Sequence, residues 1–512
     1  MLVNQFLELS AEGSPDKVAL VCGDQRLTYA EVEQLSNRAA NALRELGVRR
    51  GDRVGIWLEN CVEAVVAVFA ILKVGGTFTL INPTTKPGKV AYILDNCTAS
   101  ALFAPERRRS QVDRLLDDVS SLRFAIACGT ASTVDRITAP PVYSFGDLVE
   151  THEPERPACP SIDIDLACLI YTSGSTGDPK GVMSTHANVV FAASAIIEYL
   201  RNVPDDVIIN VLPLSFDYGL YQLLMAFRFG GTLVLERGFA YPAAVLRRIE
   251  REQVTGLPGV PTLFAMLLRL DLSRFDLASL RYLTNTAAAL PVEHIRQLRE
   301  AFPWTRLYSM YGLTETKRTL YLPPEELDAR PGSVGVPIPG TEAWIEDEAG
   351  NRLGAGEVGE LVVRGSHVMQ GYWADPEETA KRFRTARYPA ERLVYTGDLF
   401  TQDEEGFFYF VARRDDIIKS RGEKVAPKEV EGVLYRLPGV VEAAVVGVPD
   451  QLLGSAIKAF VVCGDGYGLT ERDVLRHCAR YLEDFMVPKY VEFRDALPKT
   501  ASGKIRAAAL RA

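Results

Sequence analysis

The chain has 512 residues, of which 47% are hydrophobic and 24% are charged, and its formal net charge is −9. This composition supports a sizeable packed core and excludes a disordered, collagenous or disulfide-stapled protein. The acidic balance, with no basic excess, also argues against nucleic acid as a partner.

Eight cysteines are scattered along the sequence, and none belongs to a CxxC pair or to a Cys/His cluster with metal-ligand spacing. We interpret them as small buried residues of a protein in a reducing compartment. The N-terminal residues lack a basic segment followed by an apolar one, so no signal peptide is predicted. The longest apolar run, between Glu63 and Lys73, is far shorter than the roughly 20 residues that a spanning helix needs. We therefore expect a cytoplasmic enzyme with no stable membrane insertion.

The first clear helix begins after Thr28, because Glu31 three residues later completes a capping-box pattern. Apolar residues at helical spacing continue this helix to about residue 46. Strands that alternate with helices of this length predict parallel sheets with helices packed on their faces. The predicted strands are 54–57, 77–81, 166–171, 207–212, 232–235, 254–257, 281–284 and 306–308, and the predicted helices between them are 62–74, 186–200, 219–229, 241–252, 261–269 and 291–301.

The pattern changes from about Pro331, where short alternating segments such as 341–346 and 359–364 lie between glycine-rich turns. These segments predict a small antiparallel β unit. A charged stretch at 413–416 then precedes a last portion of about 100 residues. The predicted helices there are 427–436 and 471–483, and the predicted strands are 440–447, 457–463 and 490–494, which together indicate a compact α+β domain.

The strongest local motif is Tyr171-Thr-Ser-Gly-Ser-Thr-Gly-Asp-Pro-Lys-Gly181, which follows an apolar strand. Its glycines permit backbone conformations closed to other residues, and its hydroxyl and N–H groups can surround phosphate oxygens. Lys180 adds a cation that suits phosphate. A Walker A loop ends in Gly-Lys-Ser/Thr, whereas Gly181 follows the lysine here, so a P-loop nucleotidase is the weaker nucleotide interpretation. A solvated Ser/Gly turn is the alternative without a function.

This loop resembles the phosphate-binding signature of the adenylate-forming superfamily, which includes acyl-CoA synthetases, stand-alone amino-acid adenylation enzymes and firefly-type luciferases. Further segments resemble other motifs of that family, and their order over nearly the whole chain is the specific part of the resemblance. These segments are Leu27-Thr-Tyr-Ala-Glu-Val, Leu72-Lys-Val-Gly-Gly-Thr, Tyr311-Gly-Leu-Thr-Glu315, Tyr395-Thr-Gly-Asp-Leu399, the stretch 413–424 and Leu497-Pro-Lys-Thr-Ala-Ser-Gly-Lys504.

The resemblance implies an α/β fold with a large N-terminal body and a small mobile lid. The body, 1–412, would contain two stacked parallel-sheet subdomains with helices and a small β-barrel-like unit at about 331–400. A hinge would follow at 413–419, and a small α+β C-terminal lid domain would occupy 420–512.

Joining a carboxylate to the α-phosphate of ATP brings two anions together, so the site needs cations, a magnesium ligand and a phosphate cradle. Glu315 offers a hard oxygen for Mg²⁺, and Asp398 can accept hydrogen bonds from the ribose hydroxyls. By resemblance, Lys504 bridges the carboxylate and the α-phosphate, and Arg413 adds a ribose or phosphate contact. The alternative interpretation, without the resemblance, makes each of these four an ordinary turn or surface residue.

The resemblance implies the following site residues. The implied catalytic residues are Lys504, Thr314, Glu315 and Arg413, and the implied ATP or AMP contacts are Thr172, Ser173, Gly174, Ser175, Thr176, Gly177, Lys180, Ala287, Ala288, Ala289, Tyr311, Gly312, Thr314, Asp398, Arg413 and Lys504.

The small domain of that family rotates between two half-reactions, and the resemblance assigns residues to this motion. Asp415 matches the hinge residue. Phe216, Lys419 and Gly422 are implied at the thiol tunnel of the second half-reaction, where a glycine suits a backbone that must pass close to a thiol. A plain surface turn at Gly422 remains the alternative.

The acyl pocket is implied to contain Asp217, Tyr218, Val260, Thr286 and Leu313. Amino-acid adenylating enzymes commonly carry Phe-Asp at this position, and their aspartate holds the ammonium group of the substrate. The competing interpretation makes Asp217 the cap of a helix that begins near Gly219.

Two departures from the family pattern concern this end of the site. Threonine and alanines at 286–289 replace the usual glycines and proline of the adenine slot, although small residues still leave room for a flat base. Lys317 and Arg318 replace a largely apolar sequel to the Thr-Glu motif. They could neutralise a polar acyl group, contact phosphates or face water.

The leading hypothesis is therefore an AMP-forming acyl-CoA synthetase that uses ATP and Mg²⁺ as cofactors and coenzyme A as co-substrate. A first alternative is a stand-alone amino-acid or aryl-acid adenylating enzyme that loads the phosphopantetheine of a carrier protein. A second is a catalytically degenerate homologue that only binds its ligand. The expected partners are a small carboxylic acid, ATP and CoA, with no nucleic acid, and the sequence leaves open whether the protein is a monomer or a homodimer.

Overall fold

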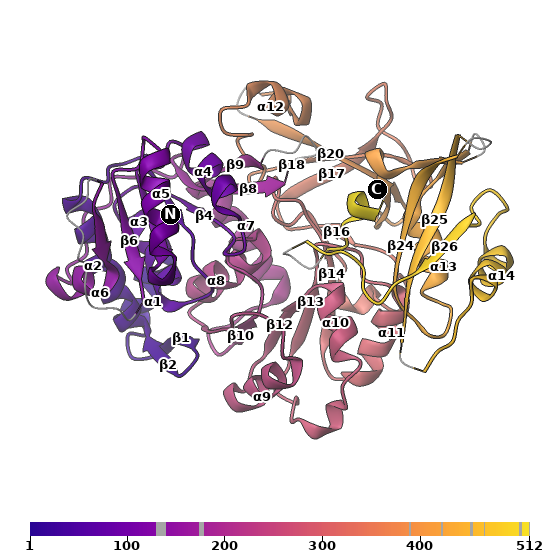
Figure 1. The fold of residues 1–512 in the computed structure, drawn as a ribbon, viewed down its shortest axis with the longest axis horizontal. Helices are drawn as coiled ribbons and strands as arrows, with labels where there is room; N and C mark the ends of the chain where they lie inside the picture. The colour runs from indigo at the N-terminus through magenta and orange to yellow at the C-terminus, as the bar shows by residue number, and fades with distance from the viewer. Residues whose placement is uncertain are drawn as a thin grey trace.

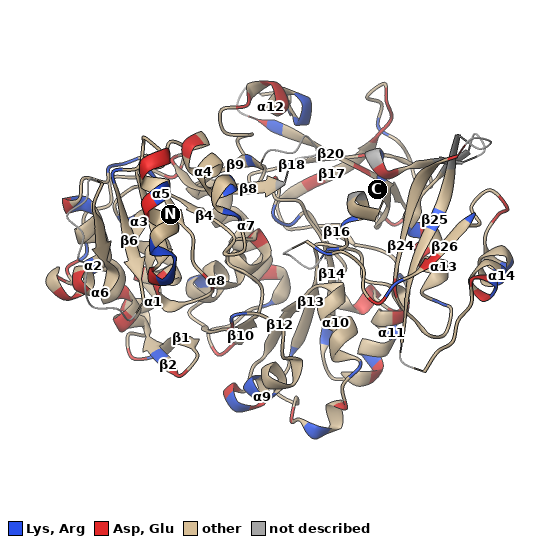
Figure 2. Ribbon diagram, in the orientation of Figure 1, with Lys and Arg blue, Asp and Glu red and all other residues tan. Residues whose placement is uncertain are grey.

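The computed structural model describes residues 1–129, 140–173, 179–388, 391–420, 423–450, 454–464, 466–500 and 504–510. Figure 1 shows the N-terminal sheets at the left and centre and the C-terminal segment, in yellow, at the right. Figure 2 colours the ribbon by residue type, and basic and acidic residues alternate along outer helices such as α14, Glu471–Tyr481. Within the described residues, no helix is long and apolar enough to cross a membrane.

The first sheet has seven strands in the order β7-β6-β5-β3-β4-β8-β9. All neighbouring pairs are parallel except β8 and β9, which form an antiparallel pair on either side of the glycine-rich motif. The strands are β3 Arg53–Ile56, β4 Thr77–Leu80, β5 Ala101–Pro105, β6 Phe124–Cys128, β7 Val142–Ser144, β8 Leu166–Ser173 and β9 Pro179–Thr185, and the helices α3 Val62–Lys73, α4 Pro87–Asn96, α5 Arg109–Asp118 and α6 Phe145–Thr151 lie between them in sequence.

The second sheet has nine strands in the order β16-β15-β14-β13-β12-β10-β11-β1-β2. Its centre, from β14 to β1, is parallel, and antiparallel strands form both edges. The strands are β1 Val18–Cys22, β2 Gln25–Thr28, β10 Val207–Asn210, β11 Thr232–Leu235, β12 Gly256–Gly259, β13 Tyr282–Asn285, β14 Arg306–Tyr311, β15 Leu320–Tyr321 and β16 Val336–Pro337, and the associated helices are α1 Gln5–Gly13, α2 Tyr29–Glu45, α7 His186–Leu200, α8 Asp217–Phe229, α9 Pro242–Glu252, α10 Pro261–Leu267 and α11 Val292–Ala301.

One apolar core joins these two sheets. It includes buried residues of the helices that connect the parallel strands, such as α3 and α8. The rings of Phe69 on α3 and Phe227 on α8 stack with their centroids 5.2 Å apart. The predicted capping box of α2 is confirmed, because Thr28 and Glu31 exchange both of its hydrogen bonds. The expected α/β body with two packed parallel-sheet layers is therefore confirmed.

Helix α8 corrects one expectation. It begins at Asp217, two residues earlier than predicted, and Phe216 occupies the N-cap position. The first helical hydrogen bond runs from the Leu220 amide to the Phe216 carbonyl, 2.9 Å. Asp217 is thus the first helical residue rather than the N-cap, and its carboxylate lies at the favourable, positive end of the helix dipole.

The third sheet is the expected antiparallel unit. Its order is β17-β18-β20-β19, and β21 pairs with the other half of β20, so the pairs among the described residues form an open five-stranded sheet. The strands are β17 Thr341–Glu346, β18 Gly359–Gly365, β19 Phe383–Thr385, β20 Arg392–Gln402 and β21 Phe408–Arg413, with helix α12 Pro376–Arg382 before β19.

The C-terminal segment has apolar clusters of its own, built from residues beyond 417. A short 3₁₀ turn, Arg414–Asp416, connects it to β21. A three-stranded sheet, in the order β24-β25-β26, forms its centre. The elements are β22 Ile418–Ser420, β23 Glu423–Val425, α13 Pro427–Leu434, β24 Val440–Asp450, β25 Gly454–Cys463, α14 and β26 Tyr490–Phe493.

Candidate active site

Three motif residues far apart in sequence meet around Asp398. The β20–β21 register sets Asp398 opposite Arg413, and the Arg413 Nε lies 3.0 Å from Asp398 Oδ1. Tyr311, at the end of β14, donates its hydroxyl to Asp398 Oδ2 at 2.6 Å. The long strand β20 therefore carries the carboxylate to the edge of the second sheet, where two partners fix its orientation.

The Asp398 carboxylate is only 3% exposed, yet it keeps capacity for a ligand. Burial raises its pKa, while the Arg413 guanidinium and the Tyr311 hydroxyl oppose that shift. Its Oδ1 is buried and accepts no hydrogen bond from the described residues, since the contact with Arg413 has ion-pair rather than hydrogen-bond geometry. An oriented, unsatisfied carboxylate oxygen of this kind can accept a sugar hydroxyl.

Glu315 lies in the turn after β14 and is held by a residue that the sequence motifs did not indicate. The Tyr372 hydroxyl donates to Glu315 Oε1 at 2.6 Å, and the Met369 amide donates to the Glu315 carbonyl at 3.0 Å. The described residues contain no group of three or more His, Cys, Asp or Glu side chains that could hold a metal. A single carboxylate suits Mg²⁺, which is commonly bound by one or two carboxylates together with substrate phosphates.

Lys180 contacts the same region from β9. Its Nζ lies 3.2 Å from Glu378 Oε1 on α12 and 5.8 Å from the centre of the Tyr372 ring. Thr172 and Lys180 are directly paired across the β8–β9 ladder. The side chain of Ser173 and the residues Gly174, Ser175, Thr176 and Gly177 lie outside the described residues.

A further cation, Arg382, comes from the end of α12 and was not indicated by any motif. Its Nη1 donates to the Thr396 carbonyl at 2.6 Å. A Cβ atom at Gly397 would come within 2.3 Å of the same Nη1, and Gly397 has a φ of +71°. The glycine therefore allows the guanidinium to approach the turn directly before Asp398, where it adds positive charge beside the predicted ribose contact.

Lys504 reaches this site from the C-terminal segment. Its backbone is fixed by a reciprocal pair of hydrogen bonds with Thr500, and it keeps contact with solvent. Surrounding protein atoms nevertheless lower the pKa of its ammonium group, and the carboxylates of Asp217, Asp398 and Glu315 raise it, while Arg413 lowers it. The ammonium is thus within electrostatic reach of carboxylates from three separate motif segments.

The adenine-slot segment keeps a glycine-like backbone despite its sequence. Ala287 has a φ of +75°, and the Asn285 side chain donates to the Ala288 carbonyl at 3.0 Å. A left-handed alanine costs about 1 kcal/mol relative to glycine. Ala289 is exposed, whereas Thr286 is buried and its hydroxyl has no hydrogen-bond partner among the described residues.

The turn that contains Gly312, Leu313 and Thr314 folds back tightly on itself. A Cβ atom at Gly312 would lie 2.1 Å from the Lys317 carbonyl oxygen, so only glycine fits this position. The Leu313 amide donates to the Thr316 hydroxyl, and Lys317 has a φ of +59°. Gly312, Leu313 and Thr314 remain partly exposed, whereas the four residues from Thr316 to Thr319 are buried.

Two of the predicted acyl residues, Asp217 and Tyr218, are the first residues of α8. The Tyr218 hydroxyl bonds to the Thr284 carbonyl and hydroxyl at 2.8 and 2.7 Å, and Val260 is buried at the N-cap of α10. Asp217 Oδ2 lies 3.9 Å from the Arg318 guanidinium. Asp217 is therefore already beside one cation and, as noted, within reach of Lys504.

The residues predicted for domain motion are described only in part. The backbone of Asp415 lies in the 3₁₀ turn, and that of Lys419 lies in β22. The side chains of Asp415 and Lys419, and Gly422 as a whole, lie outside the described residues. Phe216 is partly exposed at the N-cap of α8.

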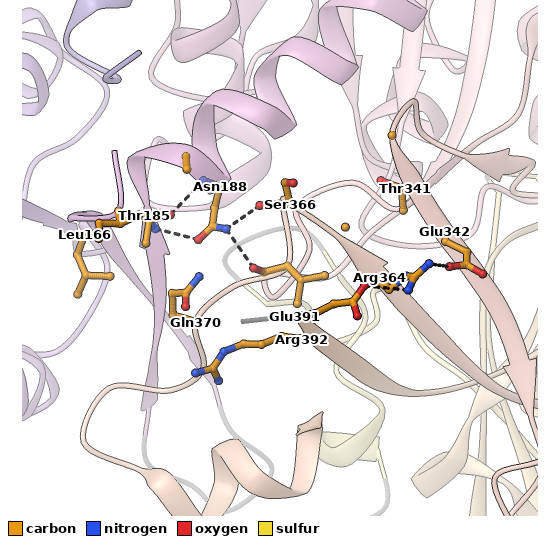
Figure 3. A pocket seen from close by; sticks show the side chains of 15 residues that line it. Leu166, Thr185, Asn188, Thr341, Glu342, Arg364, Ser366, Gln370, Glu391 and Arg392 are labelled. Atoms are coloured by element: carbon orange, nitrogen blue, oxygen red, sulfur yellow. Dashed lines mark hydrogen bonds and ion pairs between the residues drawn. The ribbon is translucent and has the colours of Figure 1, made fainter. Parts of the chain in front are cut away.

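A separate cavity of about 830 Å³ lies between the start of α7 and the third sheet (Figure 3). It contains none of the motif residues discussed above. Arg364 on its wall pairs with Glu342 at 2.5 Å and with Glu391 at 2.8 Å, and the Asn188 amide donates to the Ser366 and Val368 carbonyls. The charges of this cavity largely satisfy one another, so it is not part of the candidate active site.

Comparisons with known proteins agree with this geometry. The chain matches the AMP-binding enzyme family over residues 7–373 and the C-terminal domain of AMP-binding enzymes over 429–504. It is 31% identical to a long-chain-fatty-acid–CoA ligase of Bacillus subtilis, over 98% of this chain and 93% of that protein. It is 35% identical to a feruloyl-CoA synthase of Amycolatopsis sp., over 97% of this chain and 95% of that protein.

Among solved structures, the anthranilate CoA ligase AuaEII in complex with anthranoyl-AMP is similar with a TM-score of 0.92 and 30% identity, over 100% of this chain and 96% of that one. The chain therefore belongs to the AMP-binding enzyme family, in the acyl-CoA synthetase branch of the adenylate-forming enzymes. It is an enzyme of the acid–thiol ligase class.

Proposed function

We propose that the protein activates a small carboxylic acid with ATP and then transfers the acyl group to coenzyme A. In the first step a carboxylate oxygen attacks the α-phosphorus, a new P–O bond forms, and the α–β bridge breaks to release pyrophosphate. In the second step the thiolate of CoA attacks the acyl carbon and AMP leaves. The observation that carries this proposal is the ordered pair of carboxylates, Asp398 with Arg413 and Tyr311 and Glu315 with Tyr372, whose charges reach the Lys504 ammonium group.

The first step needs positive charge where two anions approach each other. Lys504 supplies it from the C-terminal segment, and Arg413, Arg382 and Lys180 supply it from the body. Asp398 accepts a ribose hydroxyl through its unsatisfied Oδ1 and so fixes the position of the nucleotide. Glu315, held by Tyr372, would bind Mg²⁺, which supplies charge neutralisation at the phosphates.

The domain division is part of this proposal. The body would span 1–412, the hinge 413–419 and the lid 420–512. Two facts support it: the C-terminal segment has its own apolar clusters, and a short 3₁₀ turn connects it to β21. Rotation at Asp415 would withdraw Lys504 after adenylation and present the segment around Lys419 and Gly422, near Phe216, to the thiol.

The amino-acid alternative is less favoured by the charges around Asp217. Its carboxylate lies 3.9 Å from Arg318 and is coupled to Lys504. A substrate ammonium would bring a third cation to the same carboxylate, and like charges in a partly buried site repel strongly. The relatives are named for acids as different as ferulate and long-chain fatty acids, so family membership does not select the acid.

Acid-dependent exchange of labelled pyrophosphate into ATP tests the proposal. We expect exchange with one class among fatty, aryl and other carboxylic acids, followed by capture of the acyl group by CoA. Exchange only with amino acids, or capture only by a carrier protein, would favour the first alternative. An absence of exchange with every acid would favour the degenerate homologue.

A further inference from the structure

The two residues that follow the Thr-Glu motif are cations buried inside the protein. Lys317 is 1% exposed and Arg318 is 3% exposed. The Lys317 Nζ and the Arg318 Nε have no hydrogen-bond partner among the described residues. Burying a charged group without partners is costly, and native proteins usually satisfy such groups. These two side chains therefore need an explanation beyond folding.

Another buried lysine in the same chain shows how a structural cation is satisfied. Lys73 on α3 is also fully buried, but its Nζ lies 2.6 Å from Glu33 Oε2 and also donates to Asn37. Among the described residues, no carboxylate pairs with Lys317 in this way. The contrast between the two lysines indicates that the surroundings of Lys317 suit an anion that the described residues do not provide.

The neighbours of the two cations define where that anion would lie. Arg318 stacks over the Tyr218 ring, with 4.5 Å between the guanidinium carbon and the ring centre, and it lies 3.9 Å from Asp217. Burial raises the pKa of the Cys168 thiol on β8, and the nearby charge of Lys317 opposes that shift. Burial also raises the pKa of the Tyr221 hydroxyl on α8; Cys168 and Asp217 add to that shift, and Arg318 opposes it. The cluster thus lies between β8 and the first turns of α8.

This cluster has excess positive charge and spare hydrogen-bonding capacity. Its two buried cations face one carboxylate, that of Asp217, and the buried Tyr221 hydroxyl has no hydrogen-bond partner among the described residues. The Asp217 carboxylate also raises the pKa of Lys504, so it is within electrostatic reach of that ammonium group as well as beside Arg318. A methylene chain there would leave the cations desolvated, whereas an anionic group would pair with them.

We propose that Lys317 and Arg318 bind a second carboxylate on the acid that the enzyme activates. The preferred substrate is then a compact dicarboxylic acid, with one carboxylate directed to Lys504 and the other to Lys317 and Arg318. The inference rests on the proposed acid-activating function and adds the substrate class to it.

Paired acids of similar size test this inference by pyrophosphate exchange. Glutarate is compared with valerate, and isophthalate with 3-methylbenzoate. We expect the wild-type kcat/KM to favour the diacid of at least one pair by about tenfold to a hundredfold, the range of one or two charge-assisted hydrogen bonds. In Arg318→Met and Lys317→Met that preference should disappear, and Arg318→Lys should keep part of it.

The control is Lys73→Met, which removes a buried cation outside the site. It should lower the melting temperature without changing the ratio between the two acids of a pair. The inference is overturned by an equal response of the wild type to both acids of each pair, or by an equal loss with both acids in Arg318→Met and Lys317→Met. If Arg318→Met does not fold, Lys317→Met and Arg318→Lys decide the question.

A binding measurement separates this inference from the proposed function. Melting temperature is followed with AMP plus each acid, which needs no turnover. If no acid supports exchange but a diacid raises the melting temperature of the wild type and not of Lys317→Met, the proposed function fails and the anion site stands. If exchange occurs and the diacid has no advantage in either assay, the anion site fails and the proposed function stands.

Discussion

The nucleotide end and the acyl end of the candidate site treat charge in opposite ways. At the nucleotide end, Asp398 has Arg413 and Tyr311 as partners, and Glu315 has Tyr372. At the acyl end, Lys317 and Arg318 are buried with a single carboxylate 3.9 Å from the guanidinium. On the proposals above, the first end is preorganised by its own residues for the nucleotide. The second is completed only by an acid that is particular to this chain.

Removing Lys504 should have the largest effect at the nucleotide end. In Lys504→Ala we expect pyrophosphate exchange to fall by about a thousandfold, because one preorganised charge at the reacting atoms is lost. Thioester formation from a supplied acyl-adenylate should remain largely intact. Rapid-quench assays of the two half-reactions measure this split.

Lys499→Ala is the matched control, since Lys499 lies in the same segment and pairs with Glu442 at 2.6 Å. It should leave both half-reactions near the wild-type rate. Equal losses in both half-reactions of Lys504→Ala would show that Lys504 does not act in adenylation alone.

The adjacent residues Arg413 and Arg414 offer the next comparison. Arg413→Ala removes the guanidinium 3.0 Å from Asp398 and leaves that buried carboxylate unpaired. We expect KM for ATP to rise by about tenfold to a hundredfold. Arg414 is as exposed as Arg413 but pairs with Glu360 at 3.1 Å rather than with Asp398, so Arg414→Ala should change KM by less than about twofold. Similar effects of the two variants would remove Asp398 and Arg413 from the nucleotide site.

The pH dependence of exchange reports on Lys504. Desolvation by the surrounding protein atoms lowers the pKa of Lys504 below the ordinary lysine value of 10.5, and the protonated form is the one that neutralises the anions. Exchange should therefore be lost as pH rises through a value below 10.5, by about tenfold per unit above it. In Lys504→Arg the guanidinium stays charged, so this alkaline limb should move to higher pH. If the alkaline limb of Lys504→Arg lies at the same pH as that of the wild type, another group is responsible for the titration.

The contact between Tyr372 and Glu315 should have the smallest effect of the four. Tyr372→Phe removes one hydrogen bond to a carboxylate, and we expect the magnesium concentration needed for half-maximal exchange to change by about threefold to tenfold. Tyr409→Phe is the control, because Tyr409 belongs to no motif and donates to a different carboxylate, that of Asp403, at 3.0 Å. If both variants need the same magnesium concentration, Tyr372 does not position Glu315 for the metal.

Local signals in the sequence predicted much of the fold. The capping box at Thr28 is visible within four residues, and the alternation of strands and helices is sufficient to predict the parallel sheets, both of which the structure confirms. The residues that hold the site residues in place were not predictable in this way. Tyr372, Glu378 and Arg382 belong to no motif, and they reach Glu315, Lys180 and the turn before Asp398 only because the third sheet packs against the other two.

The burial of charged side chains could not be predicted from the spacing of residues in the sequence either. Lys317 and Arg318 stand in the sequence as two ordinary charged residues, for which exposure to water is the usual outcome. They are buried beside the tight turn at Gly312, where the Lys317 carbonyl approaches so closely that no side chain fits. The start of α8 at Asp217 likewise depends on tertiary packing, since helix ends carry weak sequence signals.

The identity of the nucleotide product is the most direct test of whether the protein forms an acyl-CoA through an acyl-adenylate. The wild-type enzyme is incubated with ATP, Mg²⁺, CoA and the acids of the panel, and the products are separated and quantified. We predict that consumption of ATP depends on the acid and yields AMP, pyrophosphate and an acyl thioester in equal amounts. Formation of ADP and phosphate, or of AMP without dependence on any acid, would contradict the proposed reaction.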